Sequence, residues 1–162
     1  MSWNGVAKSN AALPPNNQKV NNMTHEALVQ LAGSLFSMVA TLTGQPLISD
    51  ALPEVHRVPH AQIEAMACQQ ACRVLAIYIP HLGIYLDDNL DIEHNEFDRS
   101  ILLHELVHHA QAVMGKYEDL SLCKSWKSSE VEAYAIQDAY LARVGSPRRI
   151  PPGIAQIMLR CP

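Results

Sequence analysis

The sequence lacks the basic patch of a nucleic-acid-binding protein and the long apolar run of a membrane-spanning protein. Of its 12 lysines and arginines only Arg148 and Arg149 are adjacent, and the net charge is −4. A nucleic-acid-binding surface normally carries a basic patch, so we expect no nucleic-acid partner. No uninterrupted apolar run approaches the roughly 20 residues of a transmembrane helix. The nearest segment, 27–44, is interrupted by polar side chains, so we expect no membrane partner either.

The sequence also lacks the Cys-x-x-Cys pairs of a Cys/His zinc site. Its cysteines are Cys68, Cys72, Cys123 and Cys161. An even number permits disulfides in an exported protein, but a chain of this length can fold without them, so the compartment stays open. Cys68 and Cys72 are expected to be buried thiols on one helix. No signal peptide is visible. We would expect an exported or periplasmic protein only if a leader had been removed from this sequence.

Length and composition predict one folded domain. The chain has 162 residues, of which 48% are hydrophobic and 17% charged, enough for one sizeable core. Residues 1–22 are polar and rich in Asn, Ala and Pro, which is typical of a flexible arm. We expect residues 23–162 to form a single domain, monomeric by default.

Apolar periodicity, caps and turn residues predict the order of helices and strands. The expected elements are a helix between Thr24 and Gly44, a strand at 54–58, a helix at 61–73, strands at 74–79 and 84–86, a helix capped by Asp98 and running to about 114, a connection at 117–127, a helix at 130–144 and a short helix at 150–159.

One stretch, residues 101–109, carries recognisable chemistry: Ile-Leu-Leu-His-Glu-Leu-Val-His-His. In a helix, His104 and His108 lie about 40° apart on one face and can direct both imidazoles at one ion. Glu105 lies beside this face and can take a proton from a metal-bound water without binding the metal. His109 is about 100° further round, so a packed or hydrogen-bonded His is expected there.

Other zinc-peptidase signatures are missing. A metzincin would need Gly and His where this chain has Gln111 and Met114, and the inverted His-x-x-Glu-His pattern is absent. A third ligand must therefore come from a later helix, where Glu130 and Glu132 compete for the role.

This arrangement resembles the gluzincin metallopeptidases, in which an HExxH helix is completed by a Glu from the next helix. The resemblance covers roughly residues 74–144 and is nearest to small, uncharacterised bacterial gluzincin-like proteins. Their Glu-x-x-Ala-Asp type motif falls on Glu130 and Ala133, with Tyr134 in place of the Asp. The family Asp usually orients a ligand His, so this task would pass to Tyr134, Asp138 or a backbone carbonyl.

The resemblance implies a zincin-like α+β fold, mostly helical, with a small and mainly antiparallel sheet beside the HExxH helix. It also implies that an edge strand receives the substrate backbone, and residues 84–86 are our candidate. The acidic residues that follow, between 87 and 96, lack the spacing of a calcium-binding EF-hand loop and are expected to be solvated.

A separate argument favours Glu130 over Glu132. Ser129 followed by Glu132 is typical of a capping box, in which the Glu side chain bonds back to the helix N-terminus. Glu132 would then be structural, and Glu130, about 200° away around the helix, would be free to face the metal.

These observations predict a zinc metallopeptidase that hydrolyses peptide or protein substrates. Zn²⁺ would be bound by His104, His108 and Glu130, and Glu105 would act as general base. The alternative is a catalytically silent zincin-fold module that binds peptide or protein. The intact Glu105 favours the enzyme, because a purely structural zinc site needs no base. Whether Tyr134 donates to the developing oxyanion or only packs stays open.

Overall fold

The computed structural model describes residues 23–46, 52–68 and 73–154, which contain four helices and three strands. The expected N-terminal arm and residues 155–159, the second half of the expected terminal helix at 150–159, lie outside these ranges. In chain order the elements are α1 (His25–Thr43), β1 (Val55–Val58), α2 (His60–Ala67), β2 (Ala76–Ile79), β3 (Gly83–Asp87), α3 (Glu96–Val113) and α4 (Leu122–Arg143). The predicted α+β class with a mostly helical content is confirmed.

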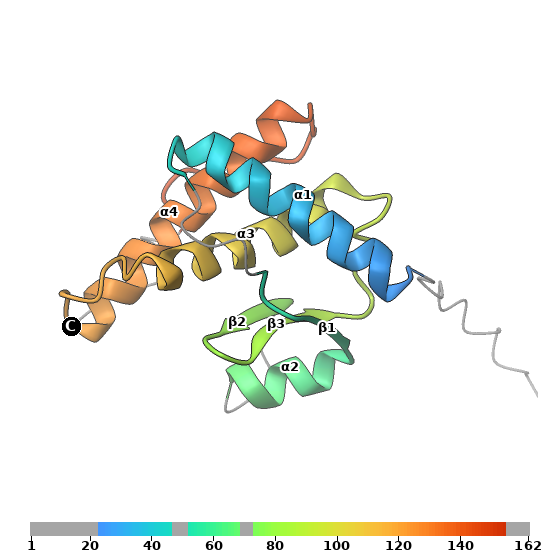
Figure 1. The fold of residues 1–162 in the computed structure, drawn as a ribbon, viewed down its shortest axis with the longest axis horizontal. Helices are drawn as coiled ribbons and strands as arrows, with labels where there is room; N and C mark the ends of the chain where they lie inside the picture. The colour runs from blue at the N-terminus through green and yellow to red at the C-terminus, as the bar shows by residue number, and fades with distance from the viewer. Residues whose placement is uncertain (1–22, 47–51, 69–72, 155–162) are drawn as a thin grey trace, which may run out of the picture.

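Helix α3 occupies the centre of the fold (Figure 1). Helices α1 and α4 pack against it, the sheet contacts it through β2 and β3, and α2 lies on the sheet. All side chains from 102 to 107 on α3 are buried. The HExxH motif is therefore embedded in the core.

Helix α1 begins and ends as its sequence predicts. The Thr24 hydroxyl accepts a hydrogen bond from the Ala27 backbone N–H at 3.2 Å, and Gly44 ends the helix with φ of 66°. In the described part of the chain, α1 is the one helix long and apolar enough to cross a membrane, judged by length and composition alone. A core helix passes the same test, and α1 buries Leu35, Phe36 and Val39 in the core.

Helix α3 begins three residues earlier than the Asp98 cap would require. Its N-cap is Asn95, whose side-chain oxygen accepts from the backbone N–H groups of Phe97 and Asp98. The Asp98 carboxylate instead accepts from the Asp91 backbone N–H at 2.9 Å. The prediction of Asp98 as cap is wrong because both residue types cap helices and only the fold shows which one is used.

Helix α4 is a full two turns longer than predicted. It begins after Ser121, so the expected connection at 117–127 is helical in its second half. Ser129 lies inside the helix and donates to the Trp126 carbonyl at 2.7 Å, so the predicted capping box is wrong. Trp126, in the added turns, is 55% exposed.

The sheet is mixed, with strand order β1-β3-β2. Strand β3 pairs in parallel with β1 and antiparallel with β2, so the expectation of a mainly antiparallel sheet is only half met. The predicted edge strand at 84–86 is wrong, because β3 is the central strand and its backbone is paired on both sides. The antiparallel edge strand is β2.

Two smaller expectations also fail. Helix α2 ends at Ala67, and Cys68 has extended backbone angles beyond its end. Cys68 and Cys123, the described cysteines, are disulfide-bonded, so the prediction of Cys68 as a helical thiol is wrong. In the acidic stretch, Asp87 is buried at the end of β3, and its carboxylate accepts from the backbone and side-chain N–H groups of Asn89.

Candidate metal centre

Three of the predicted site residues meet between α3 and α4. The Nε2 atoms of His104 and His108 lie 3.3 Å and 3.2 Å from the two carboxylate oxygens of Glu130. The candidate ligand atoms of these residues all lie within 4.8 Å of one another. Within the described ranges this is the one group of His, Cys, Asp and Glu side chains that could hold a metal ion.

The charge of the centre is concentrated on Glu130. Burial alone would raise the pKa of its carboxyl, but hydrogen bonds and charge interactions with His104 and His108 lower the pKa to about 2. Burial alone would lower the pKa of His108, yet its contacts with Glu130 and Glu105 raise it overall. The cluster therefore favours a Glu130 carboxylate that is negatively charged and faces a positive charge. A metal ion can supply that positive charge.

Glu105 lies beside the ligands but does not belong to the ligand group. Its residue is 7% exposed, and burial is the main cause that raises the pKa of its carboxyl. The neighbouring histidines and a hydrogen bond from the Tyr78 backbone N–H act in the opposite direction. A carboxyl whose pKa is raised is a stronger base than one in water, so it is better suited to accept a proton.

The outer hydrogen-bond partners of the two histidines are glutamines, which the sequence did not predict. His104 Nδ1 lies 3.1 Å from Gln137 Oε1, and His108 Nδ1 lies 2.9 Å from Gln111 Oε1. Gln137 lies seven residues, about two helical turns, after Glu130, so its face on α4 could have been predicted. Its pairing with His104 could not, because that contact joins two helices.

Of the residues that we expected to orient a ligand His, Asp138 has other partners and Tyr134 contacts His104 only through its ring. Asp138 binds Arg149 through both carboxylate oxygens and accepts from the Ile150 backbone N–H. Tyr134 packs its ring on His104, with ring centroids 4.6 Å apart. Burial is the main cause that raises the pKa of its hydroxyl, and the charges of Glu130 and Glu105 add to it.

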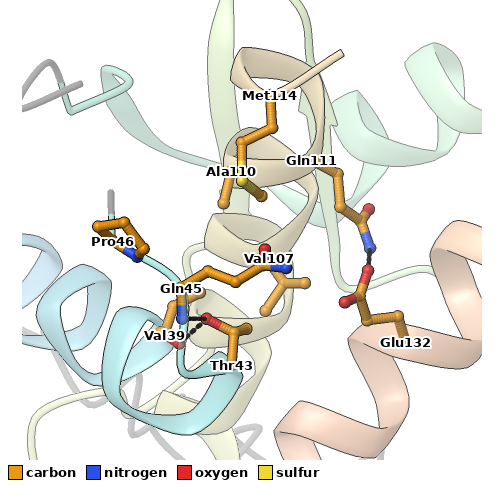
Figure 2. A pocket seen from close by; sticks show the side chains of 9 residues that line it. All are labelled: Val39, Thr43, Gln45, Pro46, Val107, Ala110, Gln111, Met114 and Glu132. Carbon is orange, nitrogen blue, oxygen red and sulfur yellow. Dashed lines mark hydrogen bonds between the residues drawn. The ribbon is translucent and has the colours of Figure 1, made fainter. Parts of the chain in front are cut away.

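Glu132 is held away from the centre. Its carboxylate accepts from Lys116, from the Tyr117 hydroxyl at 3.0 Å and from Gln111 Nε2 at 2.9 Å. Figure 2 shows Gln111 on α3 and Glu132 on α4 pointing toward each other. The prediction that Glu132 is structural thus agrees with its contacts, although the capping-box argument for it was wrong.

His109 faces away from the ligands, as its position on the helix predicts. Its residue is 8% exposed, its Nδ1 lies 3.2 Å from the Tyr78 hydroxyl, and its ring contacts Phe36. Tyr78 and His109 also line an open cleft of about 870 Å³ between the sheet and the end of α3. Tyr78 thus contributes to the wall of this cleft, and its backbone N–H is bonded to Glu105.

Comparison with known proteins assigns the chain to a family but not to an activity. The chain belongs to the family described as "Domain of unknown function (DUF6647)", whose model matches residues 29–154. The matched region contains all three candidate ligands and Glu105. No curated protein and no solved structure matches the chain.

Proposed function

We propose that this protein is a zinc-dependent metallopeptidase of the gluzincin type. The observation that carries the proposal is the meeting of His104, His108 and Glu130 around one point, with Glu105 beside them. Two imidazoles and one carboxylate are a ligand set of catalytic zinc sites, and they leave a fourth position for water or substrate. A structural zinc site normally takes four protein ligands, so the set of three favours catalysis.

The position of β2 supports a zincin-like arrangement. β2 contacts α3 and is the antiparallel edge strand of the sheet. The bond from the Asp87 N–H to the Leu75 carbonyl sets the alternation of the β2–β3 ladder, so the main-chain groups of Ala76 and Tyr78 point away from β3. The Tyr78 N–H is already bonded to Glu105, so we propose that the Ala76 main chain and the Tyr78 carbonyl, rather than residues 84–86, align an extended peptide beside the centre.

A zinc ion in this site would acidify a water molecule and polarise the carbonyl of the scissile peptide bond. Glu105 accepts the proton from the attacking water, and the same carboxyl then passes it to the leaving amine. Tyr134, whose ring packs on His104, is our candidate for a hydroxyl that donates to the developing oxyanion.

Digestion of a broad peptide library by the zinc-loaded protein tests the proposal. We expect cleavage that disappears with a chelator, returns with zinc and is absent in Glu105→Gln. Peptide binding without products would instead support the catalytically silent binding module.

A further inference from the structure

We propose that Gln137 and Gln111 are positioning residues that make His104 and His108 present unprotonated Nε2 atoms to a metal ion. The inference deepens the proposed function, because it concerns how the same centre holds its ion. It depends on the order of donors and acceptors in two hydrogen-bond chains, one for each histidine.

The first chain ends at the main chain of α3. The Ser100 hydroxyl donates to the Phe97 carbonyl at 2.6 Å, so its only hydrogen is used. Ser100 Oγ then accepts from Gln137 Nε2 at 2.9 Å. This contact turns the amide oxygen of Gln137 toward His104 Nδ1. An amide oxygen can only accept, so the neutral His104 ring that binds a metal carries its proton on Nδ1 and keeps a lone pair on Nε2.

The second chain reaches the same result by other residues. Gln111 Nε2 donates to the Ser129 carbonyl at 3.1 Å and to the Glu132 carboxylate at 2.9 Å. Both partners are acceptors, so the amide oxygen of Gln111 must face His108 Nδ1. His108 therefore also carries its proton on Nδ1. Its Nε2 lies 3.1 Å from His104 Nε2, and both lone pairs face the site of the ion.

Both direct partners are uncharged. A carboxylate bonded to a ligand His orients the ring and also makes it more basic. An amide orients the ring without adding negative charge. The Glu132 carboxylate accepts from Gln111 and does not touch His108, and it is paired with Lys116. The two imidazoles are thus oriented by uncharged partners. A variant protein with a carboxylate at position 137 should therefore bind the ion at least as tightly as wild type.

Zinc affinity, measured by competition with a chromophoric chelator, tests the roles of the two glutamines. Gln137→Leu and Gln111→Leu keep the approximate volume but remove the acceptor, and we expect zinc binding about 10- to 100-fold weaker. Gln137→Glu restores an acceptor and should keep or exceed the normal affinity. Asp138→Asn, at the neighbouring position but bonded to Arg149, is the matched control and should bind zinc normally.

A proton NMR measurement separates positioning from general stability. The zinc-loaded protein should show one slowly exchanging imidazole Nδ1–H signal for each ligand histidine, and each Leu variant should lose the signal of its own histidine. If Gln137→Leu does not unfold cooperatively on heating, Ser100→Ala tests the hydrogen-bond chain of His104 in its place. It frees the amide to rotate and should weaken zinc binding and broaden the His104 signal.

Unchanged zinc affinity and unchanged ring N–H signals in the Leu variants would overturn the inference. Equal losses in Gln137→Glu and Gln137→Leu would do so as well, because shape rather than the acceptor would then matter. Neither readout depends on peptide cleavage. A protein that responds as expected but cleaves nothing would refute the proposed function alone, and one that binds no zinc would refute both.

Discussion

The Nε2 atoms of His104 and His108 lie 3.1 Å apart, one helical turn from each other on α3. The Glu130 carboxylate from α4 faces both of them. Nitrogen and oxygen lone pairs brought this close repel one another unless a proton or a metal ion lies between them. The account of this protein therefore depends on a cation shared by the three side chains.

Replacement of Glu105 by Gln should separate metal binding from catalysis. The variant keeps the size of the side chain but cannot accept a proton, so peptide cleavage should fall by at least about 100-fold. Its zinc content should stay normal, because Glu105 is not one of the three ligands. The measurements are kcat/KM on a cleaved library peptide and metal analysis of the same sample. Cleavage at the normal rate would exclude Glu105 as the base.

Zinc should stabilise the folded protein, since the three ligands come together only in the fold. At a free zinc concentration of about 100 times Kd, the free energy of unfolding should rise by about 2.7 kcal/mol. Urea denaturation with zinc and with chelator measures the difference. His104→Ala provides the control and should show little response to zinc. An equal response in this variant would place the ion elsewhere.

The contact between Tyr140 and Glu96 should make stability depend on alkaline pH. The Tyr140 hydroxyl donates to Glu96 Oε2 at 2.7 Å, and burial followed by this contact raises the pKa of Tyr140 from 10.0 to about 12. A raised pKa in the folded state means that the stabilisation is complete below pH 10 and is lost as pH rises toward 12. Tyr140→Phe should cost about 1.5–3 kcal/mol at neutral pH.

The test of this contact compares the free energies of unfolding of the two proteins from pH 7 to pH 12. The difference between wild type and Tyr140→Phe should shrink above pH 10. A difference that does not change across this range would show that the hydroxyl proton plays no part in it.

The disulfides of Cys68 and Cys123 should contribute to stability. Reduction, or the substitution Cys123→Ser, should lower the free energy of unfolding by about 2–5 kcal/mol. Urea denaturation with and without a reductant measures this loss, and alkylation with mass spectrometry shows the state of each cysteine. Free thiols at both positions in the unreduced protein would contradict the expectation. Intact disulfides would favour the exported alternative, because such bonds persist mainly in oxidising compartments.

Local signals in the sequence were sufficient for the parts of the fold that depend on neighbouring residues. The limits of α1 follow from Thr24 and Gly44, which act within one helical turn of the helix ends. The pairing of His104 with His108 follows from helical spacing alone. Glu130 was chosen over Glu132 with the help of a family resemblance, and the structure brings Glu130 to the histidines.

Features that depend on contacts between distant segments could not be predicted. Ser129 and Glu132 have the spacing of a capping box, but the helix continues seven residues upstream of Ser129, to Leu122. The family resemblance suggested residues 84–86 as an edge strand, yet β3 pairs with β1 on one side and β2 on the other and lies in the middle. Gln111 and Gln137 carry no motif, and their roles appear only when α3 and α4 are packed together.

Metal analysis of the reconstituted protein tests the central claim most directly. Wild type, Glu130→Gln and Glu132→Gln are each loaded with zinc, freed of excess metal and measured for bound zinc. We expect one equivalent in wild type, a clear loss in Glu130→Gln and near-normal content in Glu132→Gln, whose carboxylate is occupied by Lys116 and Tyr117. Normal zinc in Glu130→Gln together with depletion in Glu132→Gln would contradict the account.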